Sequence, residues 1–209
     1  MSTAEGKKID PRIERTQEAL RNALMILIEE KGFDAISVQD ITERARLNRA
    51  TFYLHYRDKQ DLLLRTGEAV FERLVVEAGP IDRENLTFHK PPQQLMVVFQ
   101  HVAEHRDFYR VVLGKSGVPA FVARMREYLA AFILARLDSL RAFYPTAVPI
   151  LDDRFISEYT AGALLSIIIW WLENDLPHSP NYIADRFTWL SVTGTYKMMG
   201  IEPPSLDAE

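Results

Sequence analysis

Apolar residues recur every three or four positions along most of the chain, and no set of alternating strand patterns bounded by hairpin turns appears. This spacing predicts an all-helical fold. The first helix should begin at Asp10-Pro11 and end at Lys31-Gly32, because proline suits the first helical position and glycine suits the residue after a helix. Its apolar stripe consists of Ile13, Leu20, Leu24, Leu27 and Ile28.

Proline and glycine divide the rest of the chain into further helical segments, for example at Gly79-Pro80 and Tyr144-Pro145. Two short helices are predicted within residues 37–56. Longer helices are predicted at about 59–77, 92–104, 105–113, 119–143, 152–174 and 180–199. The sequence thus predicts about nine helices, preceded by a flexible N-terminus over residues 1–9.

The composition is that of a soluble globular protein, with 47% hydrophobic and 26% charged residues among 209. The absence of cysteine excludes disulfide bonds, thiolate metal sites and cysteine nucleophiles, and is compatible with a reducing cytoplasm. The longest apolar run, residues 161–172, is too short to cross about 30 Å of hydrocarbon and suits a buried helix. We therefore expect a cytoplasmic protein without a membrane segment.

Charge is distributed unevenly along the chain. The net charge of -4 by itself disfavours a nucleic-acid partner, because neutralisation of phosphates supplies most sequence-independent affinity. Residues 1–60, however, contain 11 Lys/Arg and 10 Asp/Glu and carry +1, so residues 61–209 carry -5. The negative charge therefore belongs to the C-terminal part.

The first of the two short helices has a clear start signal. Ser37 followed by Asp40 resembles a capping box, in which each side chain accepts a hydrogen bond from the other residue's backbone. Ile36 and Ile41 occupy the positions of a hydrophobic staple. This helix should therefore start independently of its neighbours.

The same arrangement recurs eleven residues later, where Asn48 is a candidate N-cap and Leu47 can pack against Phe52. Only Ala45-Arg46-Leu47 connects the two short helices, so they should cross as a helix-turn-helix. In such motifs the first turn of the second helix enters the major groove of DNA.

The second short helix should have an inner and an outer face. Phe52 and Tyr56 are four residues apart and should pack inward. On the outer side a guanidinium can donate to guanine or phosphate, hydroxyls suit phosphate, and further cations extend the positive edge. The candidates for this outer side are Arg49, Ala50, Thr51, Tyr53, His55 and Lys59.

Residues 37–63, SVQDITERARLNRATFYLHYRDKQDLL, resemble the DNA-binding motif of the TetR/AcrR family of transcriptional regulators. The most informative positions are Thr51, Phe52, Tyr53, His55, the aromatic residue at 56, Lys59 and Leu62. The resemblance covers roughly residues 12–65. It implies a DNA-binding domain over residues 10–58 and a helical effector-binding and dimerisation domain over residues 59–209. The DNA contacts that it implies are Ser37, Gln39, Asn48, Arg49, Ala50, Thr51, Tyr53, His55 and Lys59.

Arg46 departs from the family pattern, which often has glycine in this turn. A left-handed backbone would cost a non-glycine residue on the order of 1 kcal/mol. Either the turn differs slightly, or Arg46 adopts that conformation beside a DNA phosphate. On the second alternative Arg46 is a further DNA-binding candidate.

Beyond residue 65 only the order and lengths of the helices resemble the family. The resemblance implies a dimerising helical body. The last two long helices, at about 152–174 and 180–199, contain the small residues Ala161, Gly162, Ala163 and Gly194, which let helices approach closely. We therefore expect a homodimer through these helices, with two recognition helices about 34 Å apart on a pseudo-palindromic operator. It also implies a repressor whose DNA affinity responds to a small-molecule effector of unknown identity. Candidate effector contacts, each of which could instead be core, are His101, His105, Phe108, Tyr109, Tyr128, Tyr159 and Trp170.

One pattern indicates an enzyme. His101, Glu104 and His105 match the H-x-x-E-H arrangement of a class of zinc proteases, in which two histidines hold the metal and the glutamate acts as base. No third ligand or catalytic scaffold is recognisable. A zinc-dependent hydrolase and a helical adaptor without DNA binding therefore remain the alternatives to a non-enzymatic DNA-binding regulator that needs no cofactor or metal.

Overall fold

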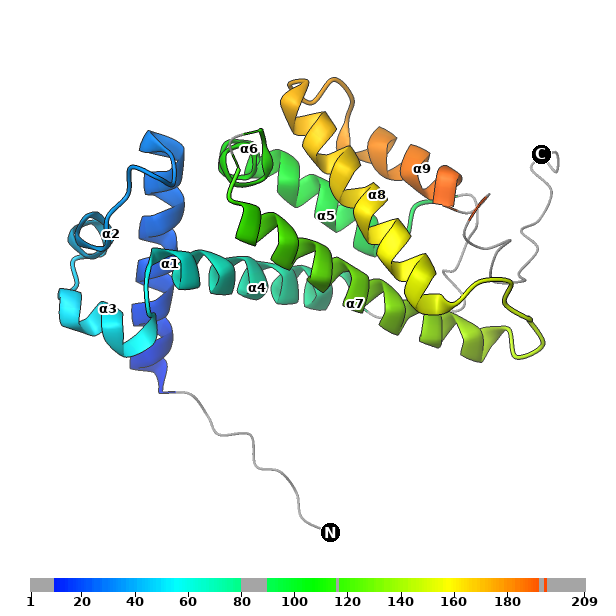
Figure 1. The fold of residues 1–209 in the computed structure, drawn as a ribbon, viewed down its shortest axis with the longest axis horizontal. Coiled ribbons are helices and arrows are strands. Elements are labelled where there is room, and N and C mark those ends of the chain that lie inside the picture. The colour runs from blue at the N-terminus through cyan, green and yellow to red at the C-terminus, as the bar shows by residue number, and fades with distance from the viewer. Residues whose placement is uncertain (1–9, 80–89, 116, 192–193, 195–209) are drawn as a thin grey trace, which may run out of the picture. The chain divides into compact units, whose positions relative to one another are not determined.

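The described part of the chain is helical in a computed structural model (Figure 1). The structure describes residues 10–79, 90–115, 117–191 and 194. Within these ranges there are nine helices and no strand. They are α1 (Pro11–Lys31), α2 (Val38–Ala45), α3 (Arg49–His55), α4 (Lys59–Ala78), α5 (Gln93–Glu104), α6 (Arg106–Leu113), α7 (Pro119–Phe143), α8 (Asp153–Glu173) and α9 (Pro180–Ser191).

The predicted all-helical fold is confirmed. At the start of α1 the Asp10 carboxylate accepts the Arg12 N–H at 2.9 Å, and after its end Gly32 has a φ of 75°. These are the signals on which the sequence prediction depended. The predicted N-terminal segment 1–9 and most of the predicted extension of the last helix to residue 199 lie outside the described residues.

The chain forms two compact units, Met1–Thr66 and Gly67–Glu209. The division falls inside α4, whereas the sequence placed the domain boundary after residue 58. The first turns of α4 belong to the N-terminal unit, because Lys59 bonds to the loop after α1 and the Arg65 guanidinium lies 5.8 Å from the centre of the Tyr56 ring.

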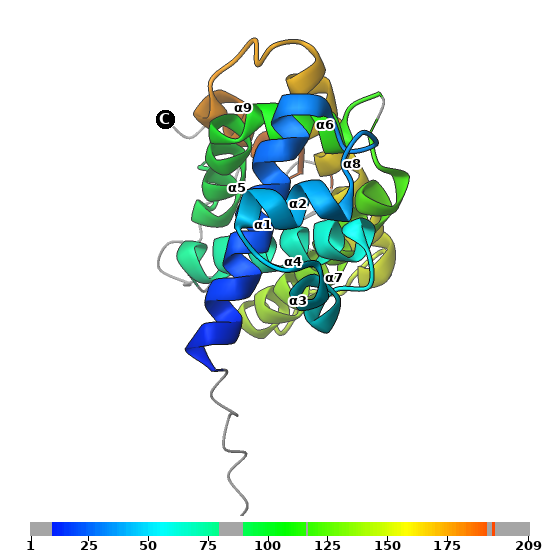
Figure 2. The ribbon, with the colours of Figure 1, turned by 90° about the vertical axis from the view of Figure 1, so that its left-hand side faces the viewer.

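In the N-terminal unit, α2 lies across α1 and α3 follows directly (Figure 2). The core of this unit includes Leu20, Leu24 and Ile28 of α1, all fully buried. The predicted stripe of α1 is therefore right from Leu20 onward. It is wrong at Ile13, which is 39% exposed. The buried residues of α1 begin at Leu20.

In the C-terminal unit, α8 packs along α7, α6 contacts both of them, and α5 packs against α9 (Figure 1). Trp171 of α8 is fully buried and meets the Phe99 ring of α5 edge-on, with the ring centroids 5.6 Å apart. The Trp171 indole N–H donates to the His178 carbonyl at 2.9 Å. This pairing of a large apolar ring with a satisfied donor fixes the end of α8.

Among the described helices, α8 alone is long and apolar enough to cross a membrane, with 21 residues and a mean hydropathy of 1.5. The apolar run within it is shorter, so the sequence predicted no such segment. However, α8 packs against α6 and α7, and both Trp171 and Leu172 are fully buried. A core helix has this composition for the same reason, and packing within the chain buries 44% of the apolar window of α8.

Candidate nucleic-acid interface

A reciprocal cap between Ser37 and Asp40 starts α2. Ser37 Oγ accepts the Asp40 N–H at 3.1 Å, and the Ser37 N–H donates to Asp40 Oδ2 at 2.7 Å. Hydrogen bonds from Ser37 and from Lys31 hold the pKa of Asp40 well below its usual range. The predicted capping box is confirmed, and Ile36 and Ile41 are both buried, as the staple requires.

The turn between α2 and α3 depends on Arg46, which has φ 55° and ψ 41°. The Arg46 N–H donates to the Glu43 carbonyl at 3.1 Å, and the Leu47 N–H donates to the Thr42 carbonyl at 2.9 Å. This pair of bonds is a Schellman motif, which normally has glycine at the left-handed position. Of the two alternatives for this turn, the structure has the left-handed one, and the Arg46 side chain is exposed.

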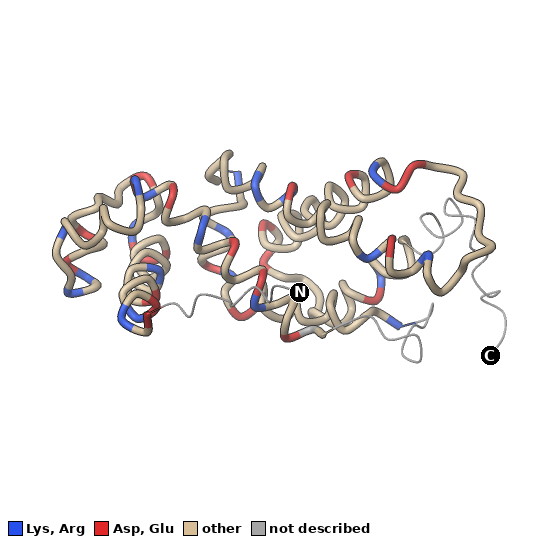
Figure 3. The backbone as a smooth tube through the Cα atoms, turned by 90° about the horizontal axis from the view of Figure 1, so that it is seen from below, with Lys and Arg blue, Asp and Glu red and all other residues tan. Residues whose placement is uncertain are grey.

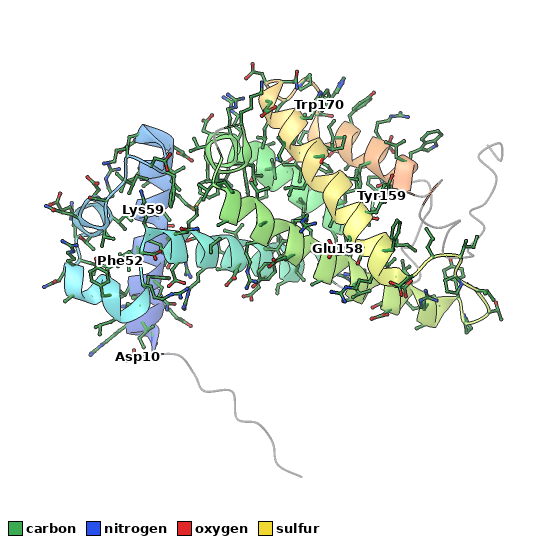
Figure 4. All side chains as sticks on the ribbon, in the orientation of Figure 1. Asp10, Phe52, Lys59, Glu158, Tyr159 and Trp170 are labelled. Atoms are coloured by element: carbon green, nitrogen blue, oxygen red, sulfur yellow. The ribbon has the colours of Figure 1, made fainter. Side chains whose placement is uncertain are left out.

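The inner face of α3 is apolar and closely packed. Asn48 caps the helix, because its Oδ1 accepts the Ala50 N–H at 2.8 Å. Phe52, labelled in Figure 4, is fully buried and lies 5.8 Å from the Tyr56 ring, centroid to centroid. Burial raises the pKa of the Tyr56 hydroxyl, which therefore stays neutral. The predicted inward packing of Phe52 and Tyr56 is confirmed.

The outer side of α3 carries a paired arginine and tyrosine. Arg49 Nη2 donates to the Tyr53 hydroxyl at 3.3 Å, and the Arg49 guanidinium carbon lies 5.7 Å from the centre of the Tyr53 ring. Tyr53 is 50% exposed. Each side chain restricts the other before any ligand binds, which reduces the entropy lost on binding. Ala50 beside them is exposed, and Thr51 is half-buried.

Three predicted residues lie at the edges of this surface. Ser37 is exposed at the start of α2, and the Gln39 amide nitrogen donates to Glu43 Oε1 at 2.8 Å. His55 is half-buried, with its ring centroid 6.4 Å from that of Tyr56. The helix-turn-helix thus brings the residues from Asn48 to Tyr53 together and leaves these three at its margins.

Lys59 has a different place from the one expected. Its ammonium donates to the carbonyls of Phe33 at 3.0 Å, Asp34 at 3.1 Å and Ile36 at 2.9 Å, and it lies 4.7 Å from the centre of the Phe33 ring. An ammonium has three protons, so these bonds use all of them. Lys59, labelled in Figure 4, thus holds the loop between α1 and α2 through three backbone carbonyls.

Two exposed residues beside the predicted set were missed. Leu54 of α3 is 81% exposed, and the side chain of Arg57, directly after α3, is 83% exposed. Arg57 could have been predicted from the sequence, because it is a cation that closely follows the second short helix. Leu54 gave none, because a leucine in a short helix is ordinarily assigned to the core.

Charges of both signs are mixed along the described helices (Figure 3). In the N-terminal unit several cations are already neutralised. Arg44 makes a bidentate ion pair with Glu30, with nitrogen to oxygen distances of 2.8 Å and 2.5 Å. Lys31 Nζ lies 2.9 Å from Asp40 Oδ1. These pairs tie α2 to α1, and Arg57 Nη2 likewise lies 3.5 Å from Asp61 Oδ1. The positive charge near α3 that is not paired with a carboxylate therefore comes mainly from Arg46 and Arg49.

Four of the residues proposed as effector contacts lie together in the C-terminal unit. The His101 ring centroid is 4.5 Å from that of His105 and 5.8 Å from that of Tyr109, and Phe108 lies 5.3 Å from Tyr109. Burial, with a smaller effect from His105, lowers the pKa of His101 to about 4. Burial also raises the pKa of the Tyr109 hydroxyl. His101, Phe108 and Tyr109 are therefore uncharged at neutral pH.

The other three candidates lie elsewhere. Tyr128 of α7 packs against Phe71 of α4, with the ring centroids 5.7 Å apart. Tyr159 and Trp170 lie along α8 (Figure 4) and are 68% and 44% exposed. The structure therefore does not bring Tyr159 and Trp170 into the cluster around His101.

The possible zinc-protease pattern gains no support from its surroundings. Glu104 Oε1 accepts a hydrogen bond from Gln100 at 2.8 Å, the two histidine rings lie against each other, and the His101 ring also lies against Tyr109. Over the described ranges, no three His, Cys, Asp or Glu side chains are grouped so that they could hold a metal ion. A hydrolase of this type needs three protein ligands for the metal.

Comparison with known sequences matches both units to families. Residues 20–66 match the family model described as bacterial regulatory proteins, tetR family. Residues 89–192 match the model described as transcriptional regulator C-terminal region. The first match ends at Thr66, where the N-terminal unit also ends.

Individual proteins agree with these matches. The transposon Tn10 TetC protein of Escherichia coli is 38% identical over 179 residues, covering 82% of this chain and 84% of that protein. YxbF of Bacillus subtilis (strain 168), an uncharacterized HTH-type transcriptional regulator, is 24% identical over 92% of this chain, which spans only 49% of YxbF. A solved TetR transcriptional regulator from Streptococcus agalactiae 2603V has a TM-score of 0.61 and 25% identity, covering 86% of this chain and 94% of that one.

Proposed function

Because the chain belongs to the tetR family of bacterial regulatory proteins, we propose that it binds an operator in double-stranded DNA through α2 and α3 and represses transcription there. The observation that carries this proposal is the outer side of α3. There the Arg49–Tyr53 pair is exposed, while Phe52, whose ring meets the Tyr53 ring edge-on at 5.4 Å, is fully buried. A helix fixed by its inner face and carrying exposed hydrogen-bonding groups on its outer side can enter the major groove without unfolding.

The proposed contacts divide into two kinds. Arg49 is the candidate for a guanine edge, because its planar guanidinium can donate twice to one base. The DNA backbone and the bases next to that guanine are contacted by Asn48, Ala50, Thr51 and Tyr53. Arg46 and Arg57 flank α3 and provide phosphate contacts, with Ser37, Gln39 and His55 at the margins. Lys59 acts indirectly, by holding the loop before α2.

The proposed assembly is a homodimer through α8 and α9, since a two-fold protein matches a pseudo-palindromic operator. On α8, Phe155 and Tyr159 are 62% and 68% exposed. Between them and Trp170 lies Gly162, where an added Cβ would meet nothing within 4 Å. Exposed aromatic rings around a small residue suit the close approach of a second helix.

The proposed regulation is by a small-molecule effector bound in the C-terminal unit near His101, His105 and Tyr109. These rings combine apolar area with polar nitrogen and hydroxyl groups, which is the usual composition of a ligand site. Tyr159 and Trp170 are reassigned from this site to the dimer surface because they are exposed on α8. The protein would act in the cytoplasm, where the DNA is, and no catalytic step is proposed.

Removal of the outer hydroxyls tests the DNA contacts. The Thr51→Val, Tyr53→Phe double variant keeps the shape of α3 and removes two hydroxyls. We expect operator affinity at fixed salt to fall about tenfold, from the loss of roughly 0.5–1.5 kcal/mol for each hydrogen bond. Gel retardation measures the affinity, and circular dichroism confirms the fold. Unchanged affinity in a folded variant would overturn the assignment of α3 as the DNA-reading helix.

A further inference from the structure

Leu54 is the most exposed of the large hydrophobic side chains in the described residues, at 81%. It lies within α3, whose inner side is already filled by Phe52. The helix does not need leucine at this position, because arginine, lysine and glutamine have almost the same helix propensity. The side chain is not buried in the folded chain either, so it is available to an apolar partner outside the chain.

Leu54 lies on the outer side of α3. It is four residues after Ala50 and three after Thr51, so these positions are neighbours on the helix surface. Ala50 is exposed and carries only a methyl group, so Ala50 and Leu54 form an apolar strip. The Arg49–Tyr53 pair adjoins the strip. The same side of α3 therefore presents both hydrogen-bonding and apolar groups.

We propose that Leu54 contacts thymine methyl groups in the operator and so determines part of its sequence, an inference that rests on the proposed DNA-binding function. In the major groove the C5-methyl of thymine is the one apolar group that the base-pair edges present. A leucine side chain that covers it removes apolar surface from water on both partners. Cytosine at the same position has no methyl group and gains nothing from Leu54.

The size of the effect follows from the methyl group alone. Burial of one methyl or methylene group corresponds to about a fourfold change in affinity. Replacing a contacted thymine by deoxyuridine removes this group and leaves every hydrogen-bonding atom in place. The fourfold loss should occur with wild-type protein and be absent with Leu54→Ala, because that variant has no side chain to cover the methyl.

The experiment combines both changes in a double-mutant cycle. The operator is first selected from genomic DNA by the full-length protein. Each thymine of one half-site is then replaced singly by deoxyuridine, and affinities are measured for wild type and Leu54→Ala at fixed salt. The matched control is Ile26→Ala, which removes another exposed apolar side chain, 43% exposed, from α1.

At one or two thymines, we expect deoxyuridine to weaken binding by wild type and by Ile26→Ala about fourfold and binding by Leu54→Ala not at all. Equal losses for all three proteins at every thymine would overturn the role of Leu54 and leave DNA binding intact. A uniform weakening of Leu54→Ala on specific and unrelated DNA alike would also overturn it, since that pattern indicates backbone packing. Failure of wild type to bind any fragment would overturn the proposed function, and this inference with it.

Discussion

The backbone and the side chain of Arg46 have separate roles. Its left-handed backbone completes the hydrogen bonds at the end of α2, although that conformation favours glycine. An arginine that tolerates this cost supplies a cation at the turn of the helix-turn-helix. Residues with such strained backbones cluster at functional sites, which agrees with the proposed phosphate contact of Arg46.

Lys59→Met should destabilise the N-terminal unit by about 2 kcal/mol, because three backbone carbonyls lose their shared donor. Denaturant unfolding measures this change. The matched control is Arg15→Met, which removes an exposed cation of α1 and should leave stability almost unchanged. A Lys59→Met protein of normal stability that binds DNA less tightly would instead restore Lys59 to the DNA contacts.

His101 should make the stability of the C-terminal unit depend on pH. Its pKa is about 4 in the folded protein and 6.5 in the reference state, so the unfolded chain takes up the proton first. The contribution of neutral His101 is complete above about pH 6.5 and is lost as the pH falls toward 4. Urea unfolding of His101→Gln should therefore show a smaller loss of stability between pH 7 and pH 5 than wild type. The same pH dependence in both proteins would contradict the burial of His101.

At the scale of helices, most boundaries could be predicted because their signals are local. Asp10, Ser37 and Asn48 all cap the helices that the sequence assigned to them. The errors depend on tertiary contacts. Periodicity carries no information on how distant segments pack. It therefore could not show whether Ile13 is covered, which carbonyls Lys59 reaches or whether Leu54 has a neighbour.

The same distinction applies to the effector candidates. Sequence spacing placed His101, His105 and Tyr109 on neighbouring helical turns, and the structure brings their rings together. Tyr159 and Trp170 have equally favourable side chains for a ligand, but α8 turns them outward. Only the direction in which a helix presents a residue separates a ligand contact from an interface contact.

Gly162→Leu tests α8 as the dimer surface. The new side chain enters open space in the single chain, so each protomer should fold, but it blocks the close approach of a second α8. We expect the dimer dissociation constant to rise by at least about tenfold in sedimentation equilibrium. Ala135→Leu on the exposed side of α7 is the control and should have no effect. Unchanged association of Gly162→Leu would place the interface elsewhere.

At the scale of the whole molecule, the two units have different chemistry. Residues 1–60 carry a net charge of +1, and the acidic excess belongs to the remainder. The N-terminal unit matches a DNA-binding family over residues 20–66, and the C-terminal unit matches a regulator C-terminal region over residues 89–192. The N-terminal unit is only weakly basic and the C-terminal unit is acidic, so the attraction to DNA phosphates that drives non-specific binding is small. Specific base contacts must therefore supply much of the affinity.

Selection of genomic DNA fragments by the full-length protein, followed by footprinting of the bound fragments, tests the central claim most directly. The account predicts retardation of a few fragments that share a two-fold symmetric site, with protected half-sites about one helical turn or a multiple of it apart. It also predicts that affinity for the bound sites falls only moderately with salt, because few cations contact phosphate. A folded, dimeric protein that retards no fragment at low salt would contradict the account and indicate a helical adaptor that retains the fold without binding DNA.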